Sequence, residues 1–315
     1  MECFPCTFLF IRFFARQSVS SFGVRSELSP TYLFCKERTT AMRPVQPYFA
    51  LSTNTYYKRQ IQRNGIAHFY DYKVDRANQN QTIAIPDGCI DLIFDYGEDN
   101  SLQARAFGSV LNGTLVQNVL NHEYFGVRFQ PGVLPGFLKG SFAEYVGQNI
   151  SLSDCCRYTN LEEQASQCRT FDERIRLITA ACRRAEQEKE LDVHHTMVKD
   201  NLVNAVMDEI LKSSGNIRIQ ALADITGYSS RYIDRVFKEY TGMSPKTFCR
   251  ITRFQNAVDR LDHDNKIPLS DLAADCGYYD QPQFIRDFRR CMDTTPRVYR
   301  QEIVKSDYIS KFVMA

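Results

Sequence analysis

The feature that most constrains this chain is an internal repeat in its C-terminal third. The stretch 217–228 recurs fifty residues later as 267–278, with its Leu-Ala and Gly-Tyr pairs in the same places. The match then continues at an offset of 51 residues as far as Pro245 and Pro296. A repeat of this length predicts two copies of one supersecondary unit that pack together.

Each copy has the pattern of a helix-turn-helix. A short helix with a buried Leu-Ala pair ends at Gly227 or Gly277, where glycine allows the positive φ of a sharp turn. Ser229 and Asp280 can then cap a second helix, which has an apolar stripe on one face. The opposite face presents Ser230, Arg231, Asp234, Arg235 and Lys238 in the first copy, and Gln281, Gln283, Arg286 and Arg289 in the second.

A longer amphipathic helix is predicted between the two copies, over 246–262. Ser244 and Pro245 are suited to begin it, because serine caps helices and proline is tolerated in the first turn. Its inner face carries Phe248, Ile251, Phe254, Ala257, Val258 and Leu261. This helix can act as a rigid spacer between the two units.

The part of the chain before the repeat is typical of β structure. Segments rich in Ile, Val, Phe and Tyr, each bounded by turn residues, lie at 66–74, 82–86, 89–96, 104–111 and 123–130. Such spacing favours a cupin-like β-barrel or sandwich. Helical spacing follows over 134–142 and again over 171–186, and the charged run at 183–192 indicates a linker.

The predicted fold is therefore α+β, with a β-barrel or sandwich domain followed by an all-α tandem helix-turn-helix domain. We expect a weakly ordered tail or upstream extension at 1–41, since orderly patterning starts only after Met42. The remaining predicted parts are a β-rich sensor domain ending in helices at 42–182, a linker at 183–197, the helix-turn-helix domain at 198–305 and a C-terminal tail at 306–315.

Composition excludes several other classes of protein. The chain has 315 residues, 43% of them hydrophobic, and a formal charge of only +2, so any nucleic-acid contact depends on a local basic face. No apolar run approaches the ~20 residues of a membrane span, so no membrane partner is expected. Eleven cysteines without framework spacing indicate a reducing cytoplasm. The five histidines lack the spacing of a metal-dependent cupin, so we expect no metal, no cofactor and no catalytic residue.

The two units resemble the double helix-turn-helix domain of the AraC family of bacterial transcription regulators. The similar stretches are GYSSRYIDRVFKEYTGMSPKTF and LAADCGYYDQPQFIRDFRRCMDTTPRVYR, within about a hundred residues from 200 to 302. Two residues depart from the family's pattern. Asp293 stands where glycine is usual, and Asp287 places a carboxylate, which repels DNA, beside the basic face.

The resemblance implies that two recognition helices enter successive major grooves of double-stranded DNA, about 10 bp apart. Arg231 and Arg235 are candidates for guanine or phosphate contacts, and Gln281 and Gln283 suit adenine. Ile285 either touches a thymine methyl group or packs under the spacer helix. The contacts expected at phosphates are Lys238, Arg289 and Arg290. Ser230, Asp234 and Arg286 complete the predicted interface.

The N-terminal domain is more loosely similar to the β-rich domain of one branch of that family. The similar stretches are IPDGCIDLIF at 85–94 and GVRFQPG at 126–132. A barrel mouth is a common small-molecule site, and the polar candidates for an effector there are His68, Asp87, Asp91, Arg105 and Arg128.

Three hypotheses remain open at this point. The first is a ligand-responsive transcription regulator, for instance an activator, with RNA polymerase, a small-molecule effector and a second copy of the chain as further partners. The second is a DNA-binding module whose N-terminal domain only dimerises or docks a protein. The third is a fusion to an enzyme or repair protein, which the missing four-cysteine zinc spacing disfavours. An internal pocket in the β-rich domain would distinguish the first hypothesis from the second.

Overall fold

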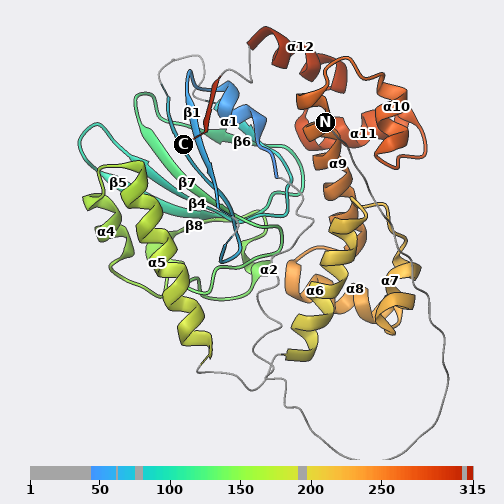
Figure 1. Cartoon of the computed structure of the whole chain (residues 1–315), viewed down its shortest axis with the longest axis horizontal. Helices are drawn as coiled ribbons and strands as arrows, with labels where there is room; N and C mark the ends of the chain where they lie inside the picture. The colour runs from blue at the N-terminus through green and yellow to red at the C-terminus, as the bar shows by residue number, and fades with distance from the viewer. Residues whose placement is uncertain (1–43, 62, 75–80, 191–196, 307–310, 315) are drawn as a thin grey trace, which may run out of the picture. The chain divides into compact units, whose positions relative to one another are not determined.

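A β-rich domain precedes a run of helices, which confirms the predicted α+β class (Figure 1). The structure, a computed structural model, describes residues 44–61, 63–74, 81–190, 197–306 and 311–314. The predicted tail at 1–41, with Cys3 and Cys6, and residues 191–196 of the predicted linker lie outside the described residues.

The larger sheet has seven strands in the order β8-β5-β4-β7-β2-β1-β9. Its strands are β1 (Tyr56–Gln60), β2 (Ile66–Lys73), β4 (Asp91–Tyr96), β5 (Leu102–Phe107), β7 (Glu123–Phe129), β8 (Asn149–Ser151) and β9 (Phe312–Met314). A separate two-stranded sheet pairs β3 (Gln81–Ala84) with β6 (Thr114–Gln117). The segments rich in Ile, Val, Phe and Tyr predicted β2, β3, β4, β5 and β7, and this signal missed the short or polar strands β1, β6 and β8.

The C-terminal end of the chain differs from the predicted tail. Strand β9 pairs in parallel with β1, and the Phe312 ring packs edge-on against Tyr56 with centroids 5.4 Å apart. The Lys311 ammonium donates to the carbonyl of Leu51 at 3.0 Å. Residues 312–314 therefore form the outermost strand of the N-terminal sheet, where their backbone pairs with β1 and the Phe312 ring contacts Tyr56.

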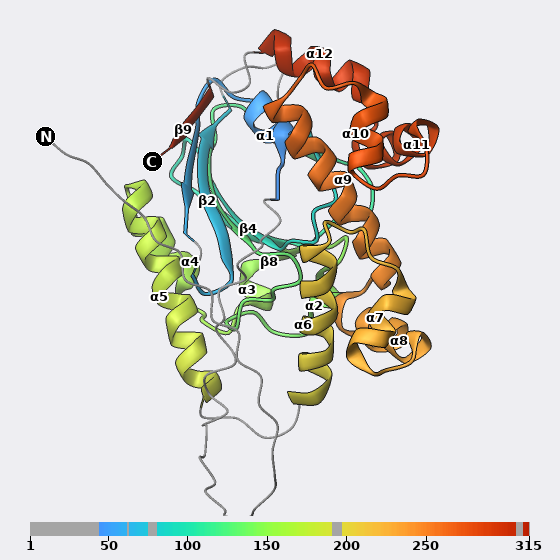
Figure 2. The ribbon, with the colours of Figure 1, turned by 45° about the vertical axis from the view of Figure 1, so that its right-hand side comes forward.

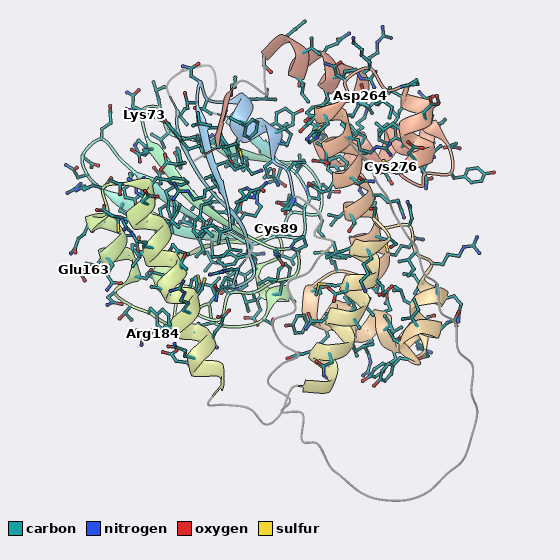
Figure 3. The ribbon with its side chains drawn as sticks, viewed as in Figure 1. Lys73, Cys89, Glu163, Arg184, Asp264 and Cys276 are labelled. Atoms are coloured by element: carbon teal, nitrogen blue, oxygen red, sulfur yellow. The ribbon has the colours of Figure 1, made fainter. Side chains whose placement is uncertain are left out.

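Helices α4 (Leu161–Gln167) and α5 (Phe171–Glu190) cover one face of the larger sheet (Figures 1 and 2). Phe171 packs edge-on against Phe125 of β7, and the Arg174 guanidinium lies over the Tyr96 ring at 3.9 Å. The predicted helix at 171–186 continues to Glu190, so the charged run at 183–192 is helix rather than linker as far as residue 190. The pair Arg184–Glu188 at 2.8 Å is one of the helical contacts that support this extension. Figure 3 labels Arg184 on α5.

The apolar spacing over 134–142 predicted a helix that the structure does not have. The segment forms turns, and only the four-residue helix α2 (Phe142–Tyr145) follows it. The reason is composition, since Pro131, Gly132, Pro135, Gly136 and Gly140 interrupt any continuous helix. The other short helices of this domain are α1 (Pro47–Leu51) and α3 (Leu152–Cys155).

The C-terminal domain consists of two similar helix-turn-helix units joined by a long helix. Its helices are α6 (Met197–Lys212), α7 (Ile219–Thr226), α8 (Ser230–Thr241), α9 (Pro245–His263), α10 (Leu269–Asp275), α11 (Gln281–Met292) and α12 (Pro296–Ser306). Gly227 and Gly277 both have a φ of +74°, as the sharp turn requires. Asp293 has a φ of +54° at the end of α11, which explains why glycine is favoured at this position.

Aromatic side chains hold both units to α9. Phe237 of α8 packs against Phe248 with ring centroids 5.7 Å apart, and Phe288 of α11 packs against Phe254 at 5.5 Å. All four rings are buried. The predicted spacer helix therefore provides the common core of the two units.

Among the helices of the described residues, none is long and apolar enough to span a bilayer.

Candidate nucleic-acid interface and buried polar cluster

Helix α8 presents a polar face because its apolar stripe is anchored in the domain core. Ser229 caps the helix, its hydroxyl accepting from the backbone N–H of Tyr232 at 3.3 Å. Ile233, Val236 and Phe237 are buried on the inner side. As a result, Arg231, Asp234, Arg235 and Lys238 are exposed and Ser230 is half-buried.

Two tyrosines that were not predicted as site residues support Arg235. The rings of Tyr228 and Tyr232 stack with centroids 5.2 Å apart, and the Arg235 guanidinium lies 5.2 Å from the centroid of Tyr232. This contact limits the conformations of the Arg235 side chain before a ligand binds, which reduces the entropy lost on binding. The available sequence signal was the pair of tyrosines on either side of the Ser229 cap, with Tyr228 in the turn and Tyr232 in the first turn of α8.

Helix α11 presents the second face, with one difference from the prediction, which concerns Gln283. The Asp280 carboxylate accepts from the backbone N–H of Gln283 at 2.7 Å, so the predicted cap is present. The Gln283 side-chain oxygen accepts from the backbone N–H of Tyr279 at 2.9 Å. Its oxygen is therefore engaged, which disfavours a bidentate adenine contact. Ile285 is half-buried and packs against a buried apolar cluster that includes Phe254 of the spacer helix and Phe288 of α11, as the alternative to a thymine contact anticipated.

The basic residues of the two units occupy equivalent positions. Arg235 and Arg286 are 51 residues apart and both are exposed, as are Lys238 and Arg289. Gln281 is half-buried at the start of α11. The same offset pairs two further exposed cations, Lys246 and Arg297, which follow the matched prolines and were not predicted.

Arg290 differs from these residues because it contacts the N-terminal domain. Its Nε donates to the side-chain oxygen of Asn112 at 2.9 Å, and its carbonyl accepts from the backbone N–H of Gly113 at 3.3 Å. Arg290 was predicted to bind phosphate. A phosphate contact would have to coexist with this bond or replace it.

In the β-rich domain, three of the five predicted effector residues, Asp87, Asp91 and Arg128, form one buried cluster, and His68 lies beside it. Strand register places His68, Arg128 and Asp91 directly opposite one another across β2, β7 and β4. Asp87 joins them from the turn before β4. The two stretches that resembled the family's N-terminal domain therefore meet here, and the backbone N–H of Gly132 donates to the carbonyl of Gly88 at 2.8 Å.

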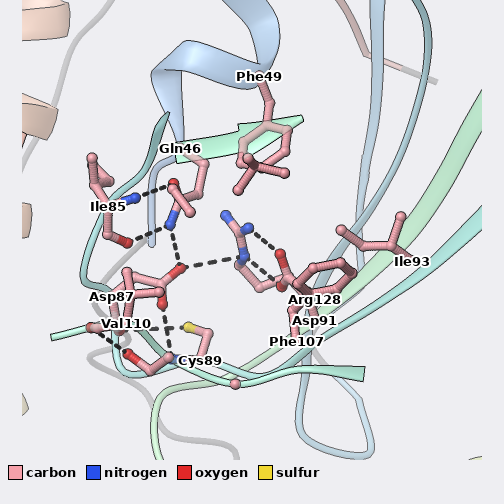
Figure 4. Close-up of a pocket in the computed structure, with 14 residues that line it drawn as sticks. Gln46, Phe49, Ile85, Asp87, Cys89, Asp91, Ile93, Phe107, Val110 and Arg128 are labelled. Carbon is pink, nitrogen blue, oxygen red and sulfur yellow. Dashed lines mark hydrogen bonds and ion pairs between the residues drawn. The ribbon is translucent and has the colours of Figure 1, made fainter. Parts of the chain in front are cut away.

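Arg128 is the centre of this cluster (Figure 4). Its Nε donates to Asp91 Oδ1 at 2.7 Å, and its Nη2 donates to Asp91 Oδ2. The Asp87 carboxylate lies 3.4 Å from the same Nε and accepts from Gln46 Nε2 at 3.0 Å. The Tyr70 hydroxyl donates to Asp91 at 3.2 Å. The cluster thus combines one cation with two carboxylates, and all three charged side chains are buried.

Tyr70 reaches Asp91 only because residue 126 has no side chain. Gly126 lies opposite Tyr70 across β2 and β7, and a methyl group there would lie 2.0 Å from Tyr70 Cζ. The ring therefore crosses β7 toward β4. This requirement explains the glycine in the middle of an otherwise large-residue strand.

A cavity of about 40 Å³ borders the cluster. Polar groups of Gln46, Asp87, Asp91 and Arg128 line one side, and Phe49, Ile85, Ile93, Phe107, Val110 and Val116 line much of the rest. One terminal nitrogen of Arg128 points away from Asp91 in Figure 4. This volume holds a molecule of few atoms, so a larger ligand must displace surrounding side chains.

His68 and Arg105 do not line this cavity. His68 is buried beside Arg128 in the sheet. Arg105 lies on β5 and donates to the side chain and backbone carbonyl of Asn149 in β8. Sequence reasoning could not separate them from the other candidates, because only the register brings Arg128 against Asp91. Gln46 was missed, since a lone glutamine before a short helix gives no signal.

Burial and neighbouring charges oppose protonation of His68. Burial, together with the positive charges of Lys58 and Arg128, holds its pKa well below the usual value. Burial also raises the pKa of Asp91, although Arg128 opposes that shift.

We expect His68 to make the fold sensitive to mild acid. Unfolded histidine protonates near pH 6.5, whereas folded His68 resists protonation, so the free energy of unfolding falls as pH drops through 6.5. Between pH 7 and 5.5, the free energy of unfolding of wild type should fall by about 1 kcal/mol more than that of His68→Gln. Urea unfolding at both values measures this difference. Equal losses in the two proteins would contradict the assignment of a neutral buried imidazole.

Two family models match the chain. A helix-turn-helix domain matches residues 222–302, which include α8 and α11. A domain of unknown function (DUF6597) matches residues 63–151, which include Asp87, Asp91 and Arg128. Within the described residues, no group of three His, Cys, Asp or Glu side chains is placed to hold a metal ion.

Similar curated proteins are bacterial regulators. The regulatory protein SoxS of Escherichia coli strain K12 is 33% identical over 110 residues, which cover 35% of this chain and 98% of SoxS. The transcriptional activator RhaR of Pectobacterium atrosepticum is 28% identical over 151 residues, 48% of this chain and 50% of RhaR. The F1 operon positive regulatory protein of Yersinia pestis is 33% identical over 106 residues, 33% of this chain and 35% of that protein. The chain thus spans half or less of the length of the last two relatives.

Solved structures show only distant likeness. ToxT from Vibrio cholerae O395 is 10% identical, with a TM-score of 0.39 over 79% of this chain and 98% of that chain. A transcriptional regulator from Chromobacterium violaceum is 21% identical, with a TM-score of 0.30 over 34% of this chain and 96% of that chain.

Proposed function

Because this chain belongs to the AraC family of transcription regulators, we propose that it binds double-stranded DNA through α8 and α11 and regulates transcription in the cytoplasm. The observation that carries this proposal is the equivalent exposure of Arg235 with Arg286 and of Lys238 with Arg289. Two copies of one polar face on a shared spacer helix suit a ligand that repeats, as DNA does once per helical turn. Members of this family are regulators rather than enzymes.

Base readout is assigned to the middle of each recognition helix. Arg235 and Arg286 would donate to guanine O6 and N7, while Arg231 contacts guanine or phosphate near the start of α8. Gln281 would bind adenine, and Gln283 would donate through its amide nitrogen. Ser230 and Asp234 border the same face. With α9 between them, the helices would read major-groove segments about 10 bp apart.

Phosphate contacts give the proposal a direct test. Lys238→Ala should weaken binding to all duplexes about equally and reduce the slope of log affinity against log salt by roughly one unit. Arg289→Ala should do the same, because it is the equivalent residue in α11. Fluorescence anisotropy titrations at several salt concentrations measure both effects. A folded wild-type chain that binds no duplex would contradict the proposed function.

Arg290→Ala should reduce the salt slope less than Arg289→Ala. The Arg290 guanidinium is already bonded to Asn112 in the N-terminal domain, so moving it to a phosphate costs that hydrogen bond. The two arginines are neighbours on the same helix, so each variant serves as the control for the other. A reduction of the salt slope in Arg290→Ala equal to or larger than that in Arg289→Ala would show that the Asn112 contact does not limit phosphate binding.

For the N-terminal domain we propose binding of a compact small-molecule effector at Arg128. The cavity beside the buried cluster supports this over a domain that only dimerises or docks a protein. Melting temperatures measured with a panel of small carboxylates and other molecules of few atoms would test it. A ligand should raise the melting temperature of wild type and have less effect on Asp87→Asn. No shift with any compound, together with a concentration-dependent dimer in sedimentation, would favour the alternative.

Activation is the proposed direction of regulation. The relative RhaR is named a transcriptional activator and the Yersinia pestis relative a positive regulatory protein. RNA polymerase is then the expected protein partner, and a second copy of the chain is a further proposed partner. Transcription in vitro with purified polymerase and a duplex that the chain binds would test this direction, and a fall in transcript would contradict it.

A further inference from the structure

The N-terminal domain contacts both helix-turn-helix units at equivalent places. At the end of α8, a methyl group on Gly242 would lie 3.0 Å from Val146 Cγ2 and 3.1 Å from the backbone of Ala143. At the end of α11, Asn112 and Gly113 bond to Arg290. Gly242 and Asp293, which end the two recognition helices, are 51 residues apart and correspond in the repeat. The domain therefore touches both recognition helices just beyond their polar faces.

Between these two contacts, Gln255 connects α9 to the same domain. Its side chain is fully buried in a helix face that is otherwise mostly apolar. The side-chain oxygen accepts from the backbone N–H of Val45 at 2.8 Å, and Nε2 donates to the carbonyls of Pro86 at 2.7 Å and Val45 at 3.3 Å. Because buried amides are costly without partners, these bonds specify one position of α9 against the N-terminal domain.

The turn that accepts from Gln255 is held firmly from its other side. Gln46 Nε2 donates to the Ile85 carbonyl at 2.6 Å and to Asp87 at 3.0 Å, and Gln46 Oε1 accepts from the Ile85 N–H at 2.8 Å. Gly88 lies so close to α9 that a methyl group there would be 2.9 Å from Phe248. The turn 85–88 is thus a rigid support for α9 as well as a wall of the cavity.

We propose that Gln255 is a positioning residue for DNA binding, whose bonds to the turn at 85–88 hold α9 so that α8 and α11 fit one separation of half-sites. This inference rests on the proposed function. Helix α9 has 19 residues, about 28 Å, which is close to the roughly 34 Å between successive major-groove segments. Because the N-terminal domain also contacts the end of α8 at Gly242 and the end of α11 at Arg290, a shift of α9 against that domain would pull on both contacts. Loss of the Gln255 bonds would therefore loosen the separation of the two recognition helices, without altering the polar face of either one.

The test varies the distance between half-sites. Half-sites recovered from a random duplex library by the wild-type chain are placed 8 to 13 bp apart, and affinity is measured by anisotropy. Wild type should prefer its best spacing by about tenfold over spacings two base pairs away, and Gln255→Met should reduce that preference to about twofold. Gln255→Met should change affinity for a single half-site by less than about twofold, since neither polar face is altered.

Thr252→Val is the matched control. Thr252 is buried on the same face of α9, one turn earlier, and its hydroxyl bonds within the helix to the Phe248 carbonyl. It should keep the full spacing preference. If Gln255→Met melts below the assay temperature, Gln46→Met tests the same turn from its other side and should also broaden the spacing preference.

Three results would overturn the inference. They are an unchanged spacing preference in Gln255→Met, an equal loss in Thr252→Val, and a loss of single half-site affinity as large as the loss of spacing preference. A wild-type chain that shows no preference for two half-sites would instead contradict the proposed reading of successive grooves.

Discussion

Replacing Arg128 with methionine is expected to lower the free energy of unfolding by about 3–5 kcal/mol. Methionine has a similar volume but leaves Asp87 and Asp91 buried beside each other without a cation. Removing one partner from a buried ion pair costs far more than replacing the whole group with apolar residues. Urea unfolding at pH 7, followed by far-ultraviolet circular dichroism, measures the change.

Arg105→Met provides the matched control, because Arg105 lies in the same sheet but bonds to Asn149 at the exposed edge. Arg105→Met should lower the free energy of unfolding by less than about 1 kcal/mol. Adding Asp91→Leu to Arg128→Met should recover part of the lost stability, since it removes one of the two uncompensated carboxylates. A loss below about 1 kcal/mol for Arg128→Met would contradict the view that this cation holds the cluster together.

Removing both Arg235 and Arg286 is expected to produce the largest loss of DNA affinity. Each substitution to alanine should cost about 1–3 kcal/mol at a matched site, because each side chain is assigned to a guanine edge. The two residues lie on different helices, so the double variant should lose about the sum of the two. Titration of one selected duplex with the two single variants and the double variant measures these three losses of binding free energy.

Arg176→Ala is the control for general charge, because Arg176 is an exposed arginine on α5 of the N-terminal domain. It should leave affinity within about twofold of wild type. A double variant that binds as tightly as wild type would remove the assigned basic contacts from the interface. A loss in Arg176→Ala equal to that in Arg235→Ala would show that net charge, rather than position on the helix, controls binding.

The C-terminal domain was predictable because the residues that shape its helices lie close together in the sequence and occur in two copies. The Gly-Tyr turn, the caps Ser229 and Asp280 and the apolar stripes are all set within a few residues, and the repeat shows each of them twice. The two faces of α8 and α11 followed from helical spacing alone. The engagement of Gln283 by Tyr279 and of Arg290 by Asn112 was not predictable, since it depends on a turn geometry and on a contact 178 residues away in sequence.

For the N-terminal domain, the sequence predicted the β-rich class but not the pairing of the strands. Segments rich in Ile, Val, Phe and Tyr located five strands. Register decides, however, that Arg128 meets Asp91, whereas Arg105 on β5 bonds to Asn149 of the edge strand β8. The helix expected over 134–142 failed because apolar spacing was counted without its interrupting prolines and glycines. The one available signal for Gln255 was a polar residue within the apolar stripe of the spacer helix. Such a residue predicts a buried partner without saying which part of the chain supplies it.

The most direct test of the central claim is a map of base preference for three proteins. Wild type, Arg235→Ala and Arg286→Ala would each be used to select duplexes from a random library at one salt concentration. Wild type should select two short segments about 10 bp apart, with Arg235→Ala relaxing preference in one segment and Arg286→Ala in the other. A single continuous segment, or the same segment relaxed by both variants, would contradict the reading of successive grooves by α8 and α11.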